Sequence, residues 1–270
     1  TNINTWLGRD ESKRMVRTLD GNARAFLSNK YRRIDNYEIA NVVLPIISEM
    51  RGAKVESCEV TDDHLYIKVV NPRLEGEVNV GDAVQAGVII RNSEVGLGSV
   101  YVAPLLYRLV CSNGMIVNDA KMRRYHVGRV NDEASELFAD DTLAADDKAL
   151  MLKLRDTVRA AVDEVQFEKI LAIMREASDV KMHGNADVVV ELTSKKFGIR
   201  DSEQGNVLNH LIAGGDLSLY GLSNAITRAS QDVDTYNRAT ELESVGWDVL
   251  TMSESAWKEI DRQRRPSKKK

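Results

Sequence analysis

The spacing of apolar side chains changes along the chain, and each spacing predicts a type of element. Between residues 36 and 50 apolar side chains recur every three or four positions, which is the period of an amphipathic helix. Asp35 or Asn36 is a suitable N-cap for this helix, and Gly52 is a suitable stop. Pro45 lies inside the pattern, so we expect a kink or a break into two shorter helices.

After Gly52 the apolar positions alternate with polar or amphipathic ones, which is the period of a strand. Leu65, Ile67 and Val69 follow this pattern behind a Thr-Asp-Asp turn, so we expect a hairpin that begins near Lys54. The same alternation continues between residues 84 and 90.

A second strand-like run, from Val100 to Cys111, is apolar at both odd and even positions. This pattern is typical of a central strand that is covered on both faces. Gly96 and Gly98 precede the run, and they fit a turn or bulge between the two long strands.

The second half of the chain is helical in its pattern. One long helix is predicted from about residue 142 to residue 178, and shorter helices are predicted over 187–197, 202–212, 217–231 and 235–246. The order of helix, antiparallel sheet and then many helices indicates an α+β fold. We divide the chain into a basic N-terminal arm (1–35), a helix plus antiparallel sheet core (36–130), a helical region that packs on the sheet (131–260) and a disordered basic tail (261–270).

Composition places this chain among globular proteins. It has 270 residues, of which 43% are hydrophobic and 29% charged, so it is long enough to bury a core. No run approaches the roughly 18 apolar residues of a membrane span, and the first residues lack the apolar centre of a secretory signal. Cys58 and Cys111 lie in apolar strand-like runs, which predicts buried, reduced thiols and a cytoplasmic location.

Several classes of chemistry lack their sequence signature. There is no phosphate-binding GxxxxGK[ST] loop, the Gly-Leu-Gly-Ser at 96–99 lacks the context of a dinucleotide site, and no GxSxG elbow is present. The four histidines are scattered without the spacing of zinc ligands. We therefore expect no cofactor, no metal and no catalytic residue. The alternative is a metal-dependent nuclease, for which acidic residues at predicted strand ends would gather around a divalent ion: Asp62, Asp63, Asp82 and Glu94.

The formal net charge of −4 is unevenly distributed, because cations gather around aromatic residues in two short segments. Guanidinium groups grip phosphates, and an aromatic ring offers a stacking face to any base, so this combination indicates single-strand binding. The simpler interpretations are a solvated charged connector and a helix start with its tyrosine packed inward. The candidate nucleic-acid-binding residues are Lys30, Tyr31, Arg32, Arg33, Lys121, Arg123, Arg124, Tyr125 and Arg129.

Four segments, 26–45, 81–117, 126–128 and 222–230, together resemble a phage- and plasmid-borne family known as domain of unknown function nine-three-two. The most specific part runs from Asn-Ser-Glu-Val-Gly to Arg-Leu-Val-Cys-Ser-Asn-Gly. The resemblance implies mobile-element biology in a bacterial host and carries no activity. At the level of the fold alone, the order of elements is similar to that of single-strand annealing proteins of the Rad-fifty-two and Red-beta kind, which form rings or filaments around DNA.

The sequence therefore predicts a non-catalytic, ATP-independent protein that binds and anneals single-stranded DNA as a homo-oligomer. The second hypothesis is a protein-interaction module of a mobile element, with an anti-defence or regulatory role, whose surfaces would be the acidic segment 132–147 and the long helix.

Overall fold

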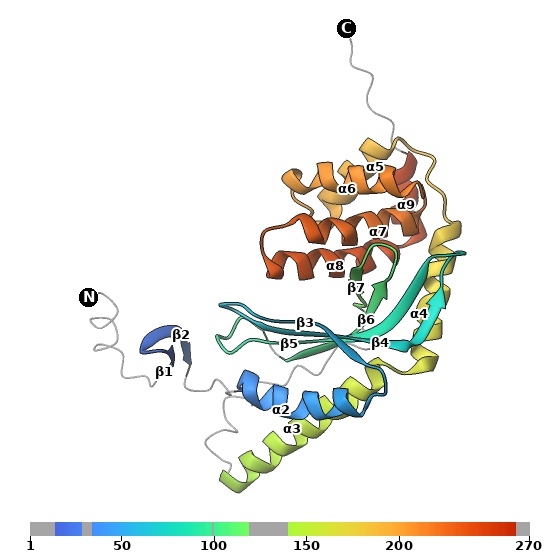
Figure 1. Cartoon of the computed structure of the whole chain (residues 1–270). Helices are drawn as coiled ribbons and strands as arrows, with labels where there is room; N and C mark the ends of the chain where they lie inside the picture. Colours follow the sequence, from blue (N-terminus) through green and yellow to red (C-terminus); the bar gives the residue numbers. More distant parts are fainter. Residues whose placement is uncertain (1–13, 29–33, 99, 119–139, 263–270) are drawn as a thin grey trace, which may run out of the picture.

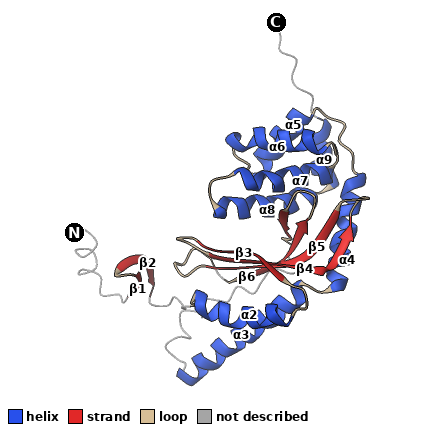
Figure 2. Ribbon diagram, viewed as in Figure 1, coloured by secondary structure: helices blue, strands red, loops and turns tan. Residues whose placement is uncertain are grey.

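The fold is described from a computed structural model, in which the described residues are 14–28, 34–98, 100–118 and 140–262. Over these residues the protein is α+β, as the sequence predicts. A central antiparallel sheet separates a layer of two helices from a larger helical bundle (Figure 1, Figure 2).

The central sheet is a five-stranded meander whose strands lie in chain order. Its strands are β3 (Lys54–Val60), β4 (Leu65–Glu77), β5 (Ala83–Asn92), β6 (Tyr101–Arg108) and β7 (Asn113–Ile116). The hairpin expected near Lys54 is thus confirmed, and so is the long apolar strand, which lies between β5 and β7. Gly96, in the turn before β6, has a φ of +82°. This is a conformation that glycine adopts at little cost.

The helices α2 (Asn36–Glu49) and α3 (Asp140–Ala161) cover one face of the sheet, where they pack on Ile67, Val88 and Ile90. Asp35 is the N-cap of α2, as predicted. The expected break at Pro45 is wrong, because α2 runs through it as one helix. The buried side chains of Ile46 and Ile47 follow the proline directly, and their packing stabilises the last turn against the loss of one hydrogen bond.

The predicted helix over 142–178 is two helices, α3 and α4 (Glu164–Asp179). The chain leaves the first helix at Val162, and the side chain of Asp163 accepts a hydrogen bond of 3.1 Å from the backbone N–H of Gln166. A local cap of this kind lets a new helix start in another direction without disturbing the apolar spacing. For this reason periodicity alone did not reveal the break.

The C-terminal bundle covers the other face of the sheet at Lys68 and also packs against the far part of β4 at Gly76. Its members are α4, α5 (Ala186–Phe197), α6 (Asp201–Gly214), α7 (Leu219–Ala229), the 3-10 helix η1 (Ser230–Asp232), α8 (Tyr236–Leu250) and α9 (Glu254–Arg262). The predicted helices over 187–246 are confirmed, whereas α9 was not predicted. Helix α9 buries only Trp257 and Ile260 against the bundle, so its apolar signal is short.

An unpredicted hairpin precedes α2. The strands β1 (Arg14–Leu19) and β2 (Asn22–Ser28) form a separate two-stranded sheet inside the stretch that was expected to be a basic arm. The hairpin stands beside one end of the central sheet (Figure 1).

The two cysteines are free thiols, as expected, but they are not buried. Cys58 is exposed on the edge strand β3, and Cys111 is half-buried in the turn after β6. The prediction failed because an apolar run can lie at a sheet edge, where one side lacks a neighbour. Among the described residues, no helix combines the length and apolar character that crossing a membrane requires.

Candidate nucleic-acid interface

Three side chains form a row across the central sheet at the end near the β1–β2 hairpin. Tyr66 on β4 pairs with Arg91 on β5, and Arg91 pairs with Tyr101 on β6. Directly paired residues point to the same face of a sheet, so the arginine lies between two tyrosines. The bundle contacts this face through Tyr236, whose ring lies beside both Tyr66 and Lys68.

Arg91 is half-buried, and no carboxylate neutralises it within the described residues. Its guanidinium carbon lies 5.1 Å from the centre of the Tyr101 ring, and its Nε is buried without a hydrogen-bond partner. An arginine over an aromatic face keeps its charge and its hydrogen-bonding groups available to a ligand. Among the described residues, Arg91 thus has no carboxylate partner on this face, whereas Lys68 is paired with Glu243.

The tyrosine on the other side of Arg91 is fixed in place by helix α8. The rings of Tyr66 and Tyr236 are 5.0 Å apart, and the Tyr66 hydroxyl donates to Oδ1 of Asn237 at 3.0 Å. The amide of Asn237 in turn donates to Asp63 in the β3–β4 turn. These contacts hold the row rigid, which reduces the entropy that would be lost when a ligand binds.

His64 lies directly before β4, at the same end of the sheet as Arg91, and it adds no charge at neutral pH. Burial lowers the pKa of His64 below its ordinary 6.5, and the nearby charge of Arg91 lowers it further. The neutral ring stacks beside Tyr66, with the ring centres 5.6 Å apart. At this end of the sheet Tyr66, Tyr101 and the neutral His64 thus surround one cation.

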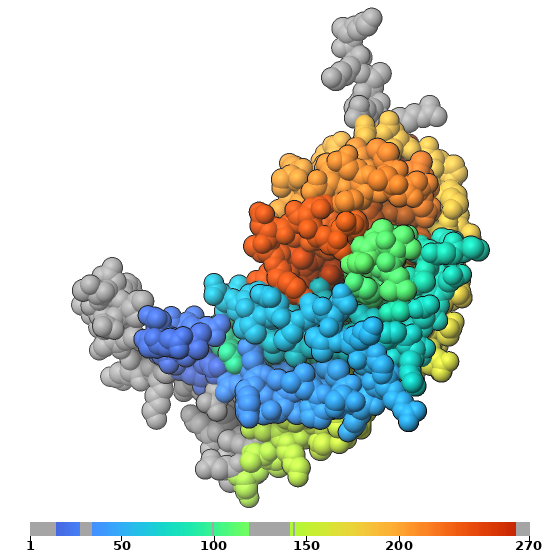
Figure 3. Space-filling view, viewed as in Figure 1, coloured from blue at the N-terminus to red at the C-terminus, as the bar shows by residue number. Residues whose placement is uncertain are grey.

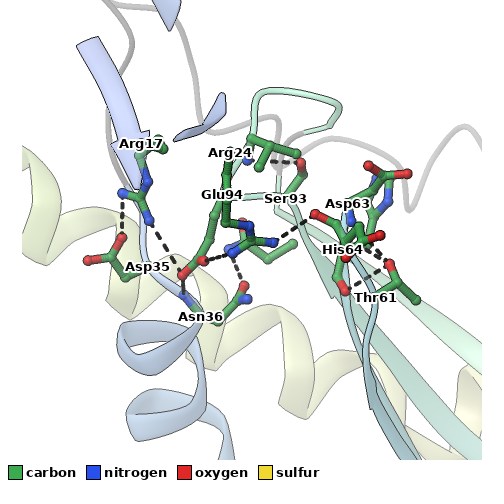
Figure 4. A network of polar contacts seen from close by, with 12 residues as sticks. Arg17, Arg24, Asp35, Asn36, Thr61, Asp63, His64, Ser93 and Glu94 are labelled. Atoms are coloured by element: carbon green, nitrogen blue, oxygen red, sulfur yellow. Dashed lines mark hydrogen bonds and ion pairs between the residues drawn. The ribbon is translucent and has the colours of Figure 1, made fainter. Parts of the chain in front are cut away.

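A second set of contacts fixes the β1–β2 hairpin to this end of the sheet (Figure 4). Arg17 and Arg24 converge on the carboxylate of Glu94, at 3.6 Å and 3.4 Å, and the backbone N–H of Asn36 also donates to it. Arg17 forms a further ion pair of 2.7 Å with Asp35. Arg17 and Arg24 of the basic arm are therefore compensated by carboxylates, and they serve to hold the hairpin.

A cavity of about 420 Å³ lies between the hairpin and two turns of the central sheet. Phe26 and Leu97 form apolar parts of its wall, and Arg24, Asp62 and Asp63 form polar parts. The Arg24 guanidinium donates to the backbone carbonyl of Asp62 at 2.7 Å, which ties the hairpin to the β3–β4 turn.

The carboxylates considered for a nuclease are not gathered. Asp82 and Glu94 flank opposite ends of β5, and Asp82 is bound by the guanidinium of Arg108 at 2.6 Å and 2.9 Å. Within residues 14–28, 34–98, 100–118 and 140–262, no three His, Cys, Asp or Glu side chains are placed to hold a metal ion.

All nine predicted nucleic-acid-binding residues lie outside the described residues: Lys30, Tyr31, Arg32, Arg33, Lys121, Arg123, Arg124, Tyr125 and Arg129. Two described residues near these segments, Asn36 after the first and Asn118 before the second, are hydrogen-bonded at the Arg91 end of the sheet. Asn36 accepts a hydrogen bond from Asn92, the neighbour of Arg91. Asn118 accepts one of 2.9 Å from the Tyr101 hydroxyl.

Arg91 was not among the predicted residues, because it is a single cation rather than part of a cluster. The available signal was its context, since it is the only charged residue in the apolar strand Ala83–Asn92. A charge in a strand that packs on both faces requires a reason, and here Arg91 lies at the end of the strand, where it stays half-buried beside the half-buried Tyr101.

The chain belongs to the family described as "Domain of unknown function (DUF932)", whose model matches residues 25–258. This confirms the resemblance found in the sequence. No curated protein and no solved structure matches the chain. The family description names no activity, so a function has to be argued from the site itself.

Proposed function

We propose that this protein binds single-stranded DNA at the Arg91 end of the central sheet and anneals complementary strands without ATP. The observation that carries the proposal is the half-buried Arg91, which has no carboxylate partner among the described residues and lies between the half-buried ring of Tyr101 and the buried ring of Tyr66. Phosphate contacts and base stacking need no particular sequence, and stacking contributes about 1–3 kcal/mol per base.

The basic segments 30–33 and 121–129 support the same location. Asn36, shortly after the first segment, and Asn118, shortly before the second, are hydrogen-bonded to Asn92 and Tyr101, the neighbours of Arg91. In this proposal the arginines and lysines of the two segments follow the phosphates while Tyr31 and Tyr125 stack on bases. Many phosphate contacts release many counterions, so affinity is expected to fall steeply with salt.

Annealing needs no hydrolysis, because pairing of the complementary strands supplies the free energy. The protein has only to hold one strand extended, with its bases accessible to a second strand. In this proposal it acts as a homo-oligomer in the cytoplasm of a bacterial host, in recombination of a phage or plasmid. The fold-level likeness to single-strand annealing proteins remains part of the proposal.

Fluorescence anisotropy with a labelled oligonucleotide tests the site. We expect Arg91→Ala to bind about tenfold more weakly or worse, because a hydrogen bond to a charged group contributes about 1.5–3 kcal/mol. The slope of log affinity against log salt should become shallower by about one. Arg73→Ala is the matched control, since it removes the same charge from the exposed far part of β4. Equal affinity of Arg91→Ala and the wild type would contradict the site.

The same samples test the two other hypotheses. Oligonucleotide incubated with Mg²⁺ or Mn²⁺ should be recovered at full length, whereas shortened products would support a metal-dependent nuclease. If the wild type binds no oligonucleotide even at low salt, the DNA-binding proposal fails and a protein-interaction module takes its place.

A further inference from the structure

The central sheet has one open edge among the described residues. At one side β7 is buried along its whole length, with α7 and α8 beside it. At the other side β3 pairs with β4 alone, and six of its seven residues are exposed. Its apolar side chains Val55 and Val60 are 48% and 60% exposed. A strand edge of this kind presents unpaired backbone groups to another strand.

The β1–β2 hairpin exposes apolar side chains as well. Val16 and Phe26 are paired across its two strands, and they are 44% and 48% exposed. Leu19 in the same hairpin is also exposed. An isolated two-stranded hairpin is marginally stable in water and gains most from a third strand. The hairpin stands at the margin of the molecule and pairs with no strand of its own central sheet (Figure 3).

The edge strand and its turn are acidic. They have the carboxylates Glu56, Glu59, Asp62 and Asp63 against Lys54. Charges on an edge strand discourage indiscriminate pairing. Arg17 and Arg24 of the hairpin are already paired with Asp35 and Glu94, so the two surfaces match through strand pairing and apolar contact rather than through charge.

We propose that the β1–β2 hairpin of one copy adds to the open β3 edge of a second copy. The added strand would form hydrogen bonds with the free backbone groups of β3. Val55, Cys58 and Val60 lie on one face of β3, and Val16 or Phe26 of the hairpin would pack beside them. Because hairpin and edge are different surfaces, the contact is head-to-tail, and repetition gives a ring or a filament. This inference rests on the homo-oligomer in the proposed function and names its interface.

Disulfide trapping tests this contact with a cysteine that the chain already has. In a Cys111→Ser background, Val16→Cys or Phe26→Cys should form a disulfide with Cys58 of another copy under mild oxidation. Non-reducing gels should then show a ladder of dimers and larger species, which Cys58→Ser abolishes. Val165→Cys is the matched control, because it is 60% exposed on α4, outside the proposed contact. Crosslinks only within one chain, or no crosslinks, would overturn the proposal.

Light scattering separates this inference from DNA binding. Phe26→Glu should shift the oligomer to a monomer, with an unchanged unfolding transition, because it places a charge on the exposed apolar patch of the hairpin. Ile212→Glu, on the exposed side of α6, should leave the oligomer intact. Arg91→Ala should remain oligomeric while it loses DNA affinity. A monomeric wild type, or an unchanged Phe26→Glu oligomer, contradicts the interface but leaves the Arg91 site untouched.

Discussion

One buried ion pair joins the central sheet to the C-terminal bundle. Nζ of Lys68, on β4, lies 2.8 Å from Oε1 of Glu243 and 2.7 Å from its Oε2, on α8, and both side chains are buried. Burial raises the pKa of Glu243, and the ammonium group of Lys68 opposes that rise. Loss of one partner is far more costly than loss of both, because it leaves a buried charge unpaired.

We expect Lys68→Met to lower the free energy of unfolding by about 3–5 kcal/mol at pH 7. In this variant nothing opposes the raised pKa of Glu243, so the folded state binds a proton more readily than the unfolded state. Stability then falls as pH rises through the interval above the ordinary pKa of 4.5, and it recovers as pH falls. Urea unfolding at pH 7 and pH 5 should therefore show a smaller deficit at the lower pH.

The control for this prediction removes both charges. Lys68→Met with Glu243→Leu should recover most of the stability at pH 7 and should show no comparable dependence on pH. A Lys68→Met deficit of the same size at both pH values would mean that the Glu243 carboxylate is not the source of the loss.

The partners of several charged residues could not be predicted from the sequence. Lys68 looked like an ordinary polar position in an alternating strand, because its partner lies 175 residues away in the chain. Arg17 and Arg24 looked like free cations, yet both meet Glu94, which was itself considered as a metal ligand. Pairing across such separations depends on the assembled fold, so charge counts along the chain could not predict it.

At the scale of elements, α7 and α8 approach each other closely at Gly246. A Cβ on Gly246 would lie 2.2 Å from Cγ2 of the buried Thr227. Since a β-branched side chain with no free space cannot move aside, Gly246→Ala should lower stability by about 1–3 kcal/mol through overpacking. Chemical denaturation measures this change directly.

Gly205 provides the opposite case within a helix of the same bundle. It lies inside α6, and a Cβ there would meet no atom within 4 Å. Gly205→Ala should therefore raise stability by about 0.4–1 kcal/mol, because alanine loses less backbone freedom on folding. Equal effects of the two substitutions would show that helix propensity, rather than the contact with Thr227, determines the result.

Elements were predicted well wherever one period extended over many residues. The strands of the central sheet and the helix starting at Asn36 are examples. The errors have local causes. Packing of Ile46 and Ile47 continued a helix through Pro45, and the Asp163 cap divided a periodic stretch into two helices. The β1–β2 hairpin was missed because its short strands mix apolar residues with arginines.

At the scale of the whole molecule, the sheet has different roles along its length. Where the bundle covers it, the row of Lys68 and Ile89 is enclosed by helix α8 and neighbouring strands. At the other end, Arg91 and Tyr101 are half-buried, whereas Tyr66 is buried beside Tyr236 of α8. Asn36 and Asn118, which are described residues near the two basic segments, are hydrogen-bonded there to Asn92 and Tyr101. The segments were predicted from the sequence, but the place of these neighbouring residues depends on strand register.

This arrangement predicts a local footprint in hydrogen–deuterium exchange. Saturating single-stranded DNA should slow exchange in peptides that cover residues 30–33, 61–66, 91–101 and 121–129, because a bound strand excludes water from their backbone groups. Peptides from α5 and α6 should exchange at the same rate with and without DNA, since they lie in the bundle beyond the sheet (Figure 1). Protection centred on α5 and α6 would contradict the proposed site, because it would place the DNA on the bundle rather than at the Arg91 end of the sheet. The Arg91→Ala variant can be compared at a DNA concentration that gives the same bound fraction as the wild type. If protection at the Arg91 end of the sheet is then unchanged, the affinity comes from the two basic segments rather than from the sheet.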